Sequence, residues 1–134
     1  MTPILEKRLL QAAMVCALPL SVVVAIGSVY AGASFLYRGI LQPSDLDSHY
    51  RYLSGIFLAL LAGFATCVPD VEHKGPRMRL LGALVITGGL ARGWGMIDVG
   101  LPTRGHMIGL GLELVVTPLL LLWQARVARR FHLP

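Results

Sequence analysis

Four long apolar stretches constrain the fold of this chain more than any other feature. They run over about residues 9–37, 50–68, 80–101 and 107–124. Each is close to or above the ~20 residues that an α-helix needs to cross the ~30 Å hydrocarbon core of a bilayer. The polar segments between them are short, and short connections join antiparallel neighbours. We therefore predict one all-α membrane domain over residues 1–134, an up-down bundle of four transmembrane helices.

The composition agrees with a chain that contacts lipid. Hydrophobic residues make up 55% of the 134 residues and charged residues only 14%, whereas soluble domains average about 45–50% and about 25%. The scarcity of charge disfavours a disordered chain and an ordinary soluble enzyme, and two cysteines disfavour a disulfide scaffold. A net charge of +5 suggests nucleic acid in a soluble protein, but here Lys and Arg are first to be interpreted as topology signals.

Basic residues gather on one side of the predicted membrane. The two termini and the break near residues 69–79 hold Lys7, Arg8, Lys74, Arg77, Arg79, Arg126, Arg129 and Arg130. The opposite side holds Arg38, Arg51 and Arg104. Because cytoplasmic loops are enriched in Lys and Arg, we expect both termini in the cytoplasm. The basic ends then contact anionic lipid and not nucleic acid.

Charged residues inside the predicted spans are the most informative, since each is costly in hydrocarbon and tends to mark a partner or a cavity. Arg92 and Asp98 lie on the third stretch, Glu113 on the fourth, and Arg51 at the start of the second. A rise of ~1.5 Å per residue places Arg92 and Glu113 within ~4 Å of the bilayer middle, and Asp98 and Arg51 ~11–12 Å to its outer side. Two pairs at matched depth are thus predicted, Arg92 with Glu113 and Arg51 with Asp98.

Two interpretations of this polar cluster remain open. A buried Arg–Glu bridge can serve only to lock the third and fourth helices together. In a binding site, Arg51 and Arg92 would hold an anionic or carbonyl-bearing head group, and Asp98 and Glu113 would orient them. The aromatic residues that would form the wall of such a pocket are also expected at a membrane interface without any ligand. They are Tyr30, Tyr50, Tyr52 and Trp94.

Small residues predict close helix packing around the charged residues. Gly89 and Gly93 have the small-xxx-small spacing that lets helix backbones approach, and Gly105 and Gly109 repeat it at the head of the fourth helix. Packing within the chain is the first interpretation, and a homo-oligomer interface is the alternative.

The ends and bends of helices have their own signals. Pro43 stops a helix, and Asp47 or Ser48 is predicted to cap the next one. Pro118 lacks an N–H and is expected to free the carbonyl of Leu114, so the fourth helix should bend.

No pattern in the sequence indicates a metal centre, a cofactor or a catalytic group. The chain has no C-x-x-C pair, nucleophile motif, phosphate loop or zinc spacing. The histidines fall at predicted helix ends, and a surface metal site from Asp47, His49 and His106 is the one alternative that they offer. The sequence therefore favours a protein that is not an enzyme.

Three segments carry a resemblance to a known family, namely 46–55, 88–92 and 112–124. They resemble an uncharacterised family of small four-helix bacterial inner-membrane proteins, classed as a domain of unknown function and loosely similar to DoxX-like proteins. The resemblance spans nearly the whole chain and includes the polar positions Asp47, Arg51, Arg92 and Glu113. It implies a fold and a bacterial inner-membrane location, and it implies no activity.

The expected function is that of a non-catalytic integral membrane protein whose constant partner is membrane lipid. It acts either as an accessory or assembly subunit of a larger membrane complex or homo-oligomer, or as a binder of a small lipophilic ligand through the polar cluster. The alternative is a small oligomeric transporter that uses Glu113 as its intramembrane carboxylate. Arg92 at the same level opposes that alternative, because it would hold the carboxylate ionised and hinder proton cycling.

Overall fold

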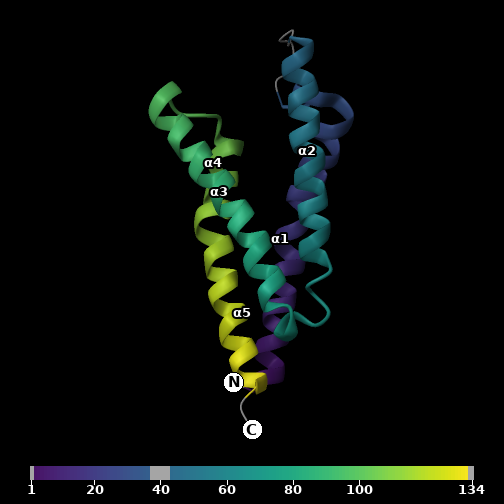
Figure 1. Ribbon diagram of the computed structural model, residues 1–134, viewed down its shortest axis with the longest axis vertical. Helices are drawn as coiled ribbons and strands as arrows, with labels where there is room; N and C mark the ends of the chain where they lie inside the picture. Colours follow the sequence, from purple (N-terminus) through teal and green to yellow (C-terminus); the bar gives the residue numbers. More distant parts are fainter. Residues whose placement is uncertain (1, 37–42, 133–134) are drawn as a thin grey trace. The chain divides into compact units, whose positions relative to one another are not determined.

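The computed structural model describes residues 2–36 and 43–132, and these residues are almost entirely helical (Figure 1). Helix α1 (Pro3–Ala31) ends in a 3-10 turn, η1 (Gly32–Phe35), and α2 (Ser44–Ala65) follows. A second 3-10 turn, η2 (Val71–His73), precedes α3 (Gly75–Val99). The last stretch consists of α4 (Arg104–Gly111), the π-helical turn η3 (Leu112–Val116) and α5 (Thr117–His132). The prediction of an all-α protein is confirmed.

Three helical stretches are long and apolar enough to cross a membrane: Pro3–Phe35, Gly75–Val99 and Arg104–Phe131. We expected four such stretches. Helix α2 differs because its first turns carry Asp45, Asp47 and Arg51, so that its apolar part begins only at Leu53.

The helices also begin before the apolar stretches that predicted them. Helix α2 begins at Ser44, with Pro43 as its N-cap residue and no side-chain capping bond. Asp47 and Ser48 therefore lie inside the helix, and the prediction that one of them caps it is wrong. The physical reason is that an apolar pattern marks the part of a helix that avoids water, whereas polar residues continue the same helix beyond that part.

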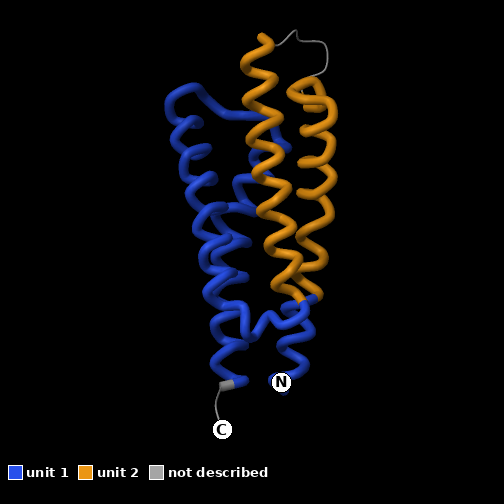
Figure 2. The backbone as a smooth tube through the Cα atoms, turned by 45° about the vertical axis from the view of Figure 1, so that its right-hand side comes forward, with its two compact units in different colours: residues 1–11, 69–134 blue, residues 12–68 orange. Residues whose placement is uncertain are grey.

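The contacts within the chain divide it into two compact units (Figure 2). Unit 1 comprises Met1–Gln11 and Pro69–Pro134, and unit 2 comprises Ala12–Val68. Helix α1 thus contributes its first turns to unit 1 and the rest of its length to unit 2. The single domain over residues 1–134 stays a prediction.

In unit 1, α3 packs closely against η3 and α5. A Cβ added to Gly82 would lie 2.5 Å from Cδ1 of Leu121, and one added to Gly89 would lie 2.8 Å from Cδ2 of Leu114. The two glycines lie about two turns apart on α3, and the two leucines about two turns apart in the opposite order. The contact is therefore antiparallel, with each leucine side chain seated over a glycine.

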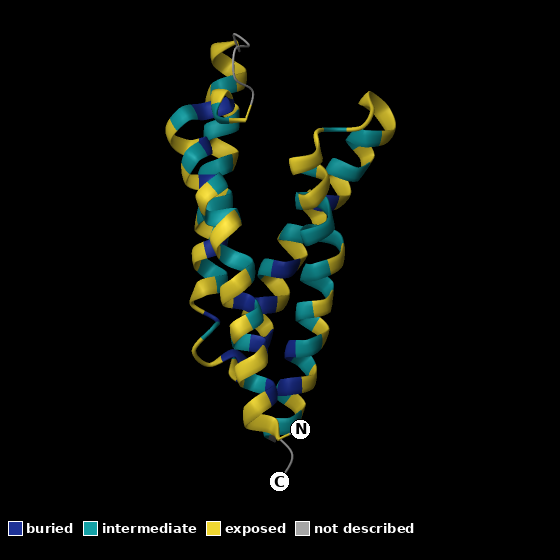
Figure 3. Cartoon of the chain, turned by 180° about the vertical axis from the view of Figure 1, so that it is seen from behind, coloured by how far each residue is buried: buried dark blue, intermediate teal, exposed yellow. Residues whose placement is uncertain are grey.

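Exposed side chains run along the helices of both units, and many of them are large and apolar (Figure 3). An apolar exterior is expected of helices that lie in lipid, because lipid tails are as apolar as leucine. In unit 1 the fully buried side chains come from the first turns of α1, from η2, from the start of α3 and from α5: Leu10, Glu6, Val71, Met78, Gln124 and Val127.

Candidate functional site

An ion pair between Arg92 and Glu113 joins α3 to η3 in unit 1. Nη2 of Arg92 lies 3.0 Å from Oε1 of Glu113. The side chain of Glu113 is 13% exposed and that of Arg92 is 36% exposed. The pairing that was predicted from matched depth is confirmed.

Arg92 and Glu113 both have hydrogen-bonding groups that are not satisfied by the described residues. Oε2 of Glu113 is buried and has no hydrogen-bond partner among those residues. Nη1 of Arg92 donates to the main-chain carbonyl of His106 over 3.5 Å, which is a long and weak bond. Since a guanidinium has five N–H donors and an ionised carboxylate has only acceptors, the pair presents free donors and a free acceptor side by side.

Glycines make room for this ion pair. A Cβ added to Gly89 would lie 2.9 Å from the Cβ of Glu113, and one added to Gly109 would lie 3.0 Å from Nη1 of Arg92. These two contacts support packing within the chain at the predicted small-residue positions. Among the described residues, nothing lies within 4 Å of a Cβ added at Gly88, Gly93, Gly95 or Gly105.

Glu113 lies in a π-helical turn, in which the N–H of Thr117 donates to the carbonyl of Leu112. The Thr117 hydroxyl donates to the same carbonyl over 2.9 Å. In this i→i+5 register the partner of residue 118 is Glu113, and Pro118 has no N–H to donate. This register places Glu113 opposite Pro118, whereas the α-helical register on which the prediction was based places Leu114 there. Such π turns within α-helices occur frequently at functional sites.

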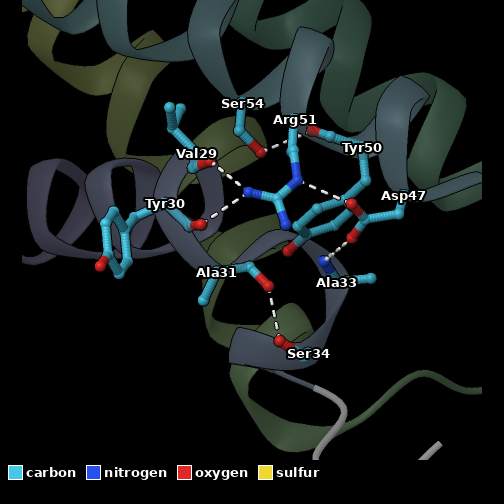
Figure 4. Close-up of polar contacts among 9 residues, drawn as sticks. All are labelled: Val29, Tyr30, Ala31, Ala33, Ser34, Asp47, Tyr50, Arg51 and Ser54. Carbon is cyan, nitrogen blue, oxygen red and sulfur yellow. Dashed lines mark hydrogen bonds and ion pairs between the residues drawn. The ribbon is translucent and has the colours of Figure 1, made fainter. Parts of the chain in front are cut away.

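Arg51 lies in unit 2, where it closes the end of α1 (Figure 4). Its Nη1 donates to the main-chain carbonyls of Val29 over 2.9 Å and Tyr30 over 2.6 Å. Its Nε donates to Oδ2 of Asp47 over 2.7 Å. A cation on the last carbonyls of a helix satisfies acceptors that have no helical donor and opposes the negative end of the helix dipole. Arg51 therefore has a structural role in tying α2 to the end of α1.

Asp47 completes this junction. Its Oδ1 accepts the N–H of Ala33 over 3.0 Å. The hydrogen bond from Arg51 and then the one from Ala33 hold the pKa of the Asp47 carboxyl below its ordinary value of 3.8. Gly32 has a φ of 61°, a conformation that favours glycine, and a Cβ added there would collide with Oδ1 of Asp47.

Three of the aromatic residues predicted to form a pocket wall are strongly exposed, with Tyr30 at 88%, Tyr52 at 64% and Trp94 at 71%. The Tyr30 ring points away from Arg51 in Figure 4. Tyr50, the fourth of these aromatic residues, is half-buried, and its hydroxyl lies 3.2 Å from that of the buried Ser28.

Asp98 is exposed near the end of α3 in unit 1. Its predicted pairing with Arg51 joins residues of two different units and stays a prediction. Within the described part of the chain, no three His, Cys, Asp or Glu residues are grouped so that they could hold a metal ion.

A second charged network in unit 1 was missed by the sequence analysis. The carboxylate of Glu6 is 2% exposed, lies 2.8 Å from Nε of Arg126 and also pairs with Arg130. The buried carboxylate of Glu72 accepts a hydrogen bond from Nζ of Lys7 over 2.5 Å. Burial acts to raise the pKa of Glu72, but the hydrogen bonds from Lys7 and from the main chain outweigh it and lower that pKa below its ordinary value.

The buried Gln124 extends this network by donating to the main-chain carbonyl of Val71 over 2.9 Å. Together these contacts hold the first turns of α1 and the turn η2 to α5. Two signals were present in the sequence: Glu6 directly precedes a basic pair, and Gln124 interrupts an apolar run.

A family described as "Domain of unknown function (DUF4345)" matches residues 9–124. No curated protein and no solved structure matches the chain. The matched residues include the Arg92–Glu113 pair and the Asp47–Arg51 junction. Glu6, Arg126 and Arg130 lie outside the match, so the family pattern covers two of the three charged clusters completely.

Proposed function

The chain belongs to the DUF4345 family of unknown function, and from this premise we propose that it is an integral membrane protein that binds the polar head of a small lipophilic ligand. The ligand-contacting residues are Arg92 and Glu113, and the protein is not a catalyst. The observation that supports this proposal is the buried Oε2 of Glu113, which has no hydrogen-bond partner within residues 2–36 and 43–132 and lies beside a partly exposed guanidinium.

The energetics favour a ligand over a bridge that is purely structural. Placing a charged side chain at the middle of a membrane helix costs roughly 2.5–3.5 kcal/mol, and a buried ion pair is close to break-even overall. A buried acceptor without a partner adds a cost of about 1–3 kcal/mol. A ligand group that donates to Oε2 of Glu113 removes this last cost, and a bridge alone does not.

The proposal includes a location and a topology. The chain forms a four-helix transmembrane bundle of the DoxX-like kind in a bacterial inner membrane, with both termini in the cytoplasm. The excess of Lys and Arg at the termini and in the segment before α3 supports this orientation. Helix α2 then crosses with residues 53–65 as its apolar part and keeps its charged first turns at the outer membrane surface.

Two other roles remain as outcomes of the test. An accessory or assembly subunit, or a homo-oligomer, would use the exposed apolar faces of the helices to bind protein. A transporter would require Glu113 to take up and release a proton, which a guanidinium 3.0 Å away opposes.

Native mass spectrometry of the protein released from lipid nanodiscs tests the proposal. Wild type and Arg104→Ala, which removes an exposed arginine of α4, are expected to retain one small molecule per chain. Arg92→Ala is expected to lose it. A bare wild-type chain would contradict ligand binding, and protein chains released together with it would favour the accessory role.

A further inference from the structure

We propose that the ligand class recognised by Arg92 and Glu113 is an uncharged lipophilic molecule whose head group carries an N–H or O–H donor together with an acceptor oxygen. This inference rests on the proposed function and adds the chemistry of the head group. Primary amides, protonated carboxylic acids and alcohols with long apolar chains belong to this class. Esters, ethers, tertiary amides and carboxylate anions do not.

The first argument is the charge of the site. Arg92 and Glu113 form a pair with no net charge. An anionic head group would compete with Glu113 for the guanidinium and would bring a like charge next to the carboxylate. A cationic head group would meet the guanidinium in the same way. Because an unpaired charge is expensive away from water, the neutral pair favours a neutral head group.

The second argument is the pattern of free hydrogen-bonding groups. Oε2 of Glu113 is a buried acceptor with no hydrogen-bond partner in the described part of the chain. In the register of this π-helical turn the main-chain carbonyl of Glu113 also stands opposite Pro118, which has no N–H to donate. The acceptor groups at Glu113 therefore favour a ligand that donates a hydrogen bond.

The acceptor of the ligand is matched by Arg92. Its guanidinium is partly exposed, and among the described residues it contacts the carboxylate of Glu113 and the distant carbonyl of His106. A carbonyl or hydroxyl oxygen of the head group can accept one of the remaining N–H groups. A head group with both functions satisfies the two partners of the ion pair at the same time.

Three probes of equal chain length separate these requirements. Oleamide is a primary amide with a donor and an acceptor, N,N-dimethyloleamide keeps only the acceptor, and oleate at alkaline pH is an anion. Binding of each to the protein in nanodiscs is measured by native mass spectrometry. Because a hydrogen bond to a charged group contributes about 1.5–3 kcal/mol, we expect oleamide to bind about tenfold or more tightly than N,N-dimethyloleamide, and oleate to bind more weakly than oleamide.

Glu113→Gln tests the direction of the hydrogen bond. The side-chain oxygen of glutamine can still accept a hydrogen bond from Arg92, while its NH2 group faces the ligand. A hydrogen-bond donor then replaces the acceptor Oε2. We expect the preference for oleamide over N,N-dimethyloleamide to disappear or reverse in this variant. Asp45→Asn, which changes an exposed carboxylate on α2, is expected to keep the wild-type preference.

The outcomes separate this inference from the proposed function. Equal binding of the two amides to wild type, or tighter binding of oleate, overturns the inference and leaves ligand binding in place. Failure of all three probes to bind wild type contradicts the proposed function as well.

Discussion

Nη2 of Arg92 on α3 lies 3.0 Å from Oε1 of Glu113 on η3, across a contact in which both helices are antiparallel and closely packed. Gly89, less than one turn before Arg92, lies directly against Glu113 and Leu114. The distance between the two charged side chains is therefore set by the packing of the helix backbones. A change in that packing will move the charges, and a change in the charges will strain the packing.

Reversing the charges tests whether the bridge stabilises the chain. Arg92→Glu and Glu113→Arg each place two like charges together, and each is expected to lower the free energy of unfolding by about 3–5 kcal/mol. The double variant restores opposite charges and should recover a large part of that loss. The measurement is thermal unfolding in mild detergent. If the double variant is no more stable than either single variant, the ion pair between residues 92 and 113 does not stabilise the chain.

Gly89→Ala and Gly88→Ala form a matched pair on α3. The added methyl group at position 89 meets Leu114 and Glu113, whereas the one at position 88 has nothing within 4 Å among the described residues. We expect Gly89→Ala to destabilise the protein by about 1–3 kcal/mol, as overpacking does. Gly88→Ala should be neutral or slightly stabilising, since alanine is the better helix former. Equal effects in denaturation experiments would show that α3 and η3 do not approach so closely.

Asp47→Asn should change how stability depends on pH. The pKa of Asp47 is lowered in the folded chain, so its stabilising effect is present above the ordinary value of 3.8 and is lost as the pH falls through the folded value. We therefore expect wild type to be more stable than the variant at about pH 6, and the difference to shrink towards about pH 2.5. Unfolding temperatures of wild type and Asp47→Asn, measured across this pH range, test the prediction.

Asp45→Asn is the control for that experiment, because Asp45 is exposed in the same first turn of α2. The unfolding temperature of Asp45→Asn should stay close to that of wild type at every pH. If the Asp47→Asn difference is also independent of pH, the hydrogen bonds of Asp47 do not contribute as the structure indicates.

Glu6→Gln should loosen the first turns of α1. The substitution removes the carboxylate that Arg126 and Arg130 share. Breaking ion pairs at a buried carboxylate destabilises by about 3–5 kcal/mol, and the loss is smaller here because Arg126 is largely exposed. Hydrogen exchange of residues 3–11 is expected to accelerate, while α2 exchanges as in wild type. Arg8→Gln, a change at an exposed position of the same helix, should leave both unchanged. Unaltered exchange in Glu6→Gln would contradict the role of this network.

The sequence was sufficient to predict the all-α fold and the Arg92–Glu113 pair. Long apolar stretches indicate helices, and two charges at equal depth on helices joined by a short turn have few other partners. Arg51 was harder. Its ion pair with Asp47 has the i, i+4 spacing of a helix, but its hydrogen bonds to the main-chain carbonyls of Val29 and Tyr30 leave no trace in a pattern of side chains.

The network around Glu6 was missed for a different reason. Basic residues at the ends of apolar stretches are expected to contact lipid, so Arg126 and Arg130 were interpreted as topology signals. A single acidic residue buried between them changes that interpretation. Burial of Glu6 depends on which elements pack against the first turns of α1, and this is a property of the tertiary structure and not of the local sequence.

Photo-crosslinking in nanodiscs with a diazirine-bearing long-chain primary amide tests the central claim most directly, because it shows where on the chain the head group lies. An alkyl diazirine without a head group serves as the control for lipid-facing surfaces. We expect the amide probe to label peptides that contain Arg92 and Glu113, and Arg92→Ala to lose this labelling. Labelling spread over the exposed helix faces in the same way as the control would contradict a ligand site at this ion pair.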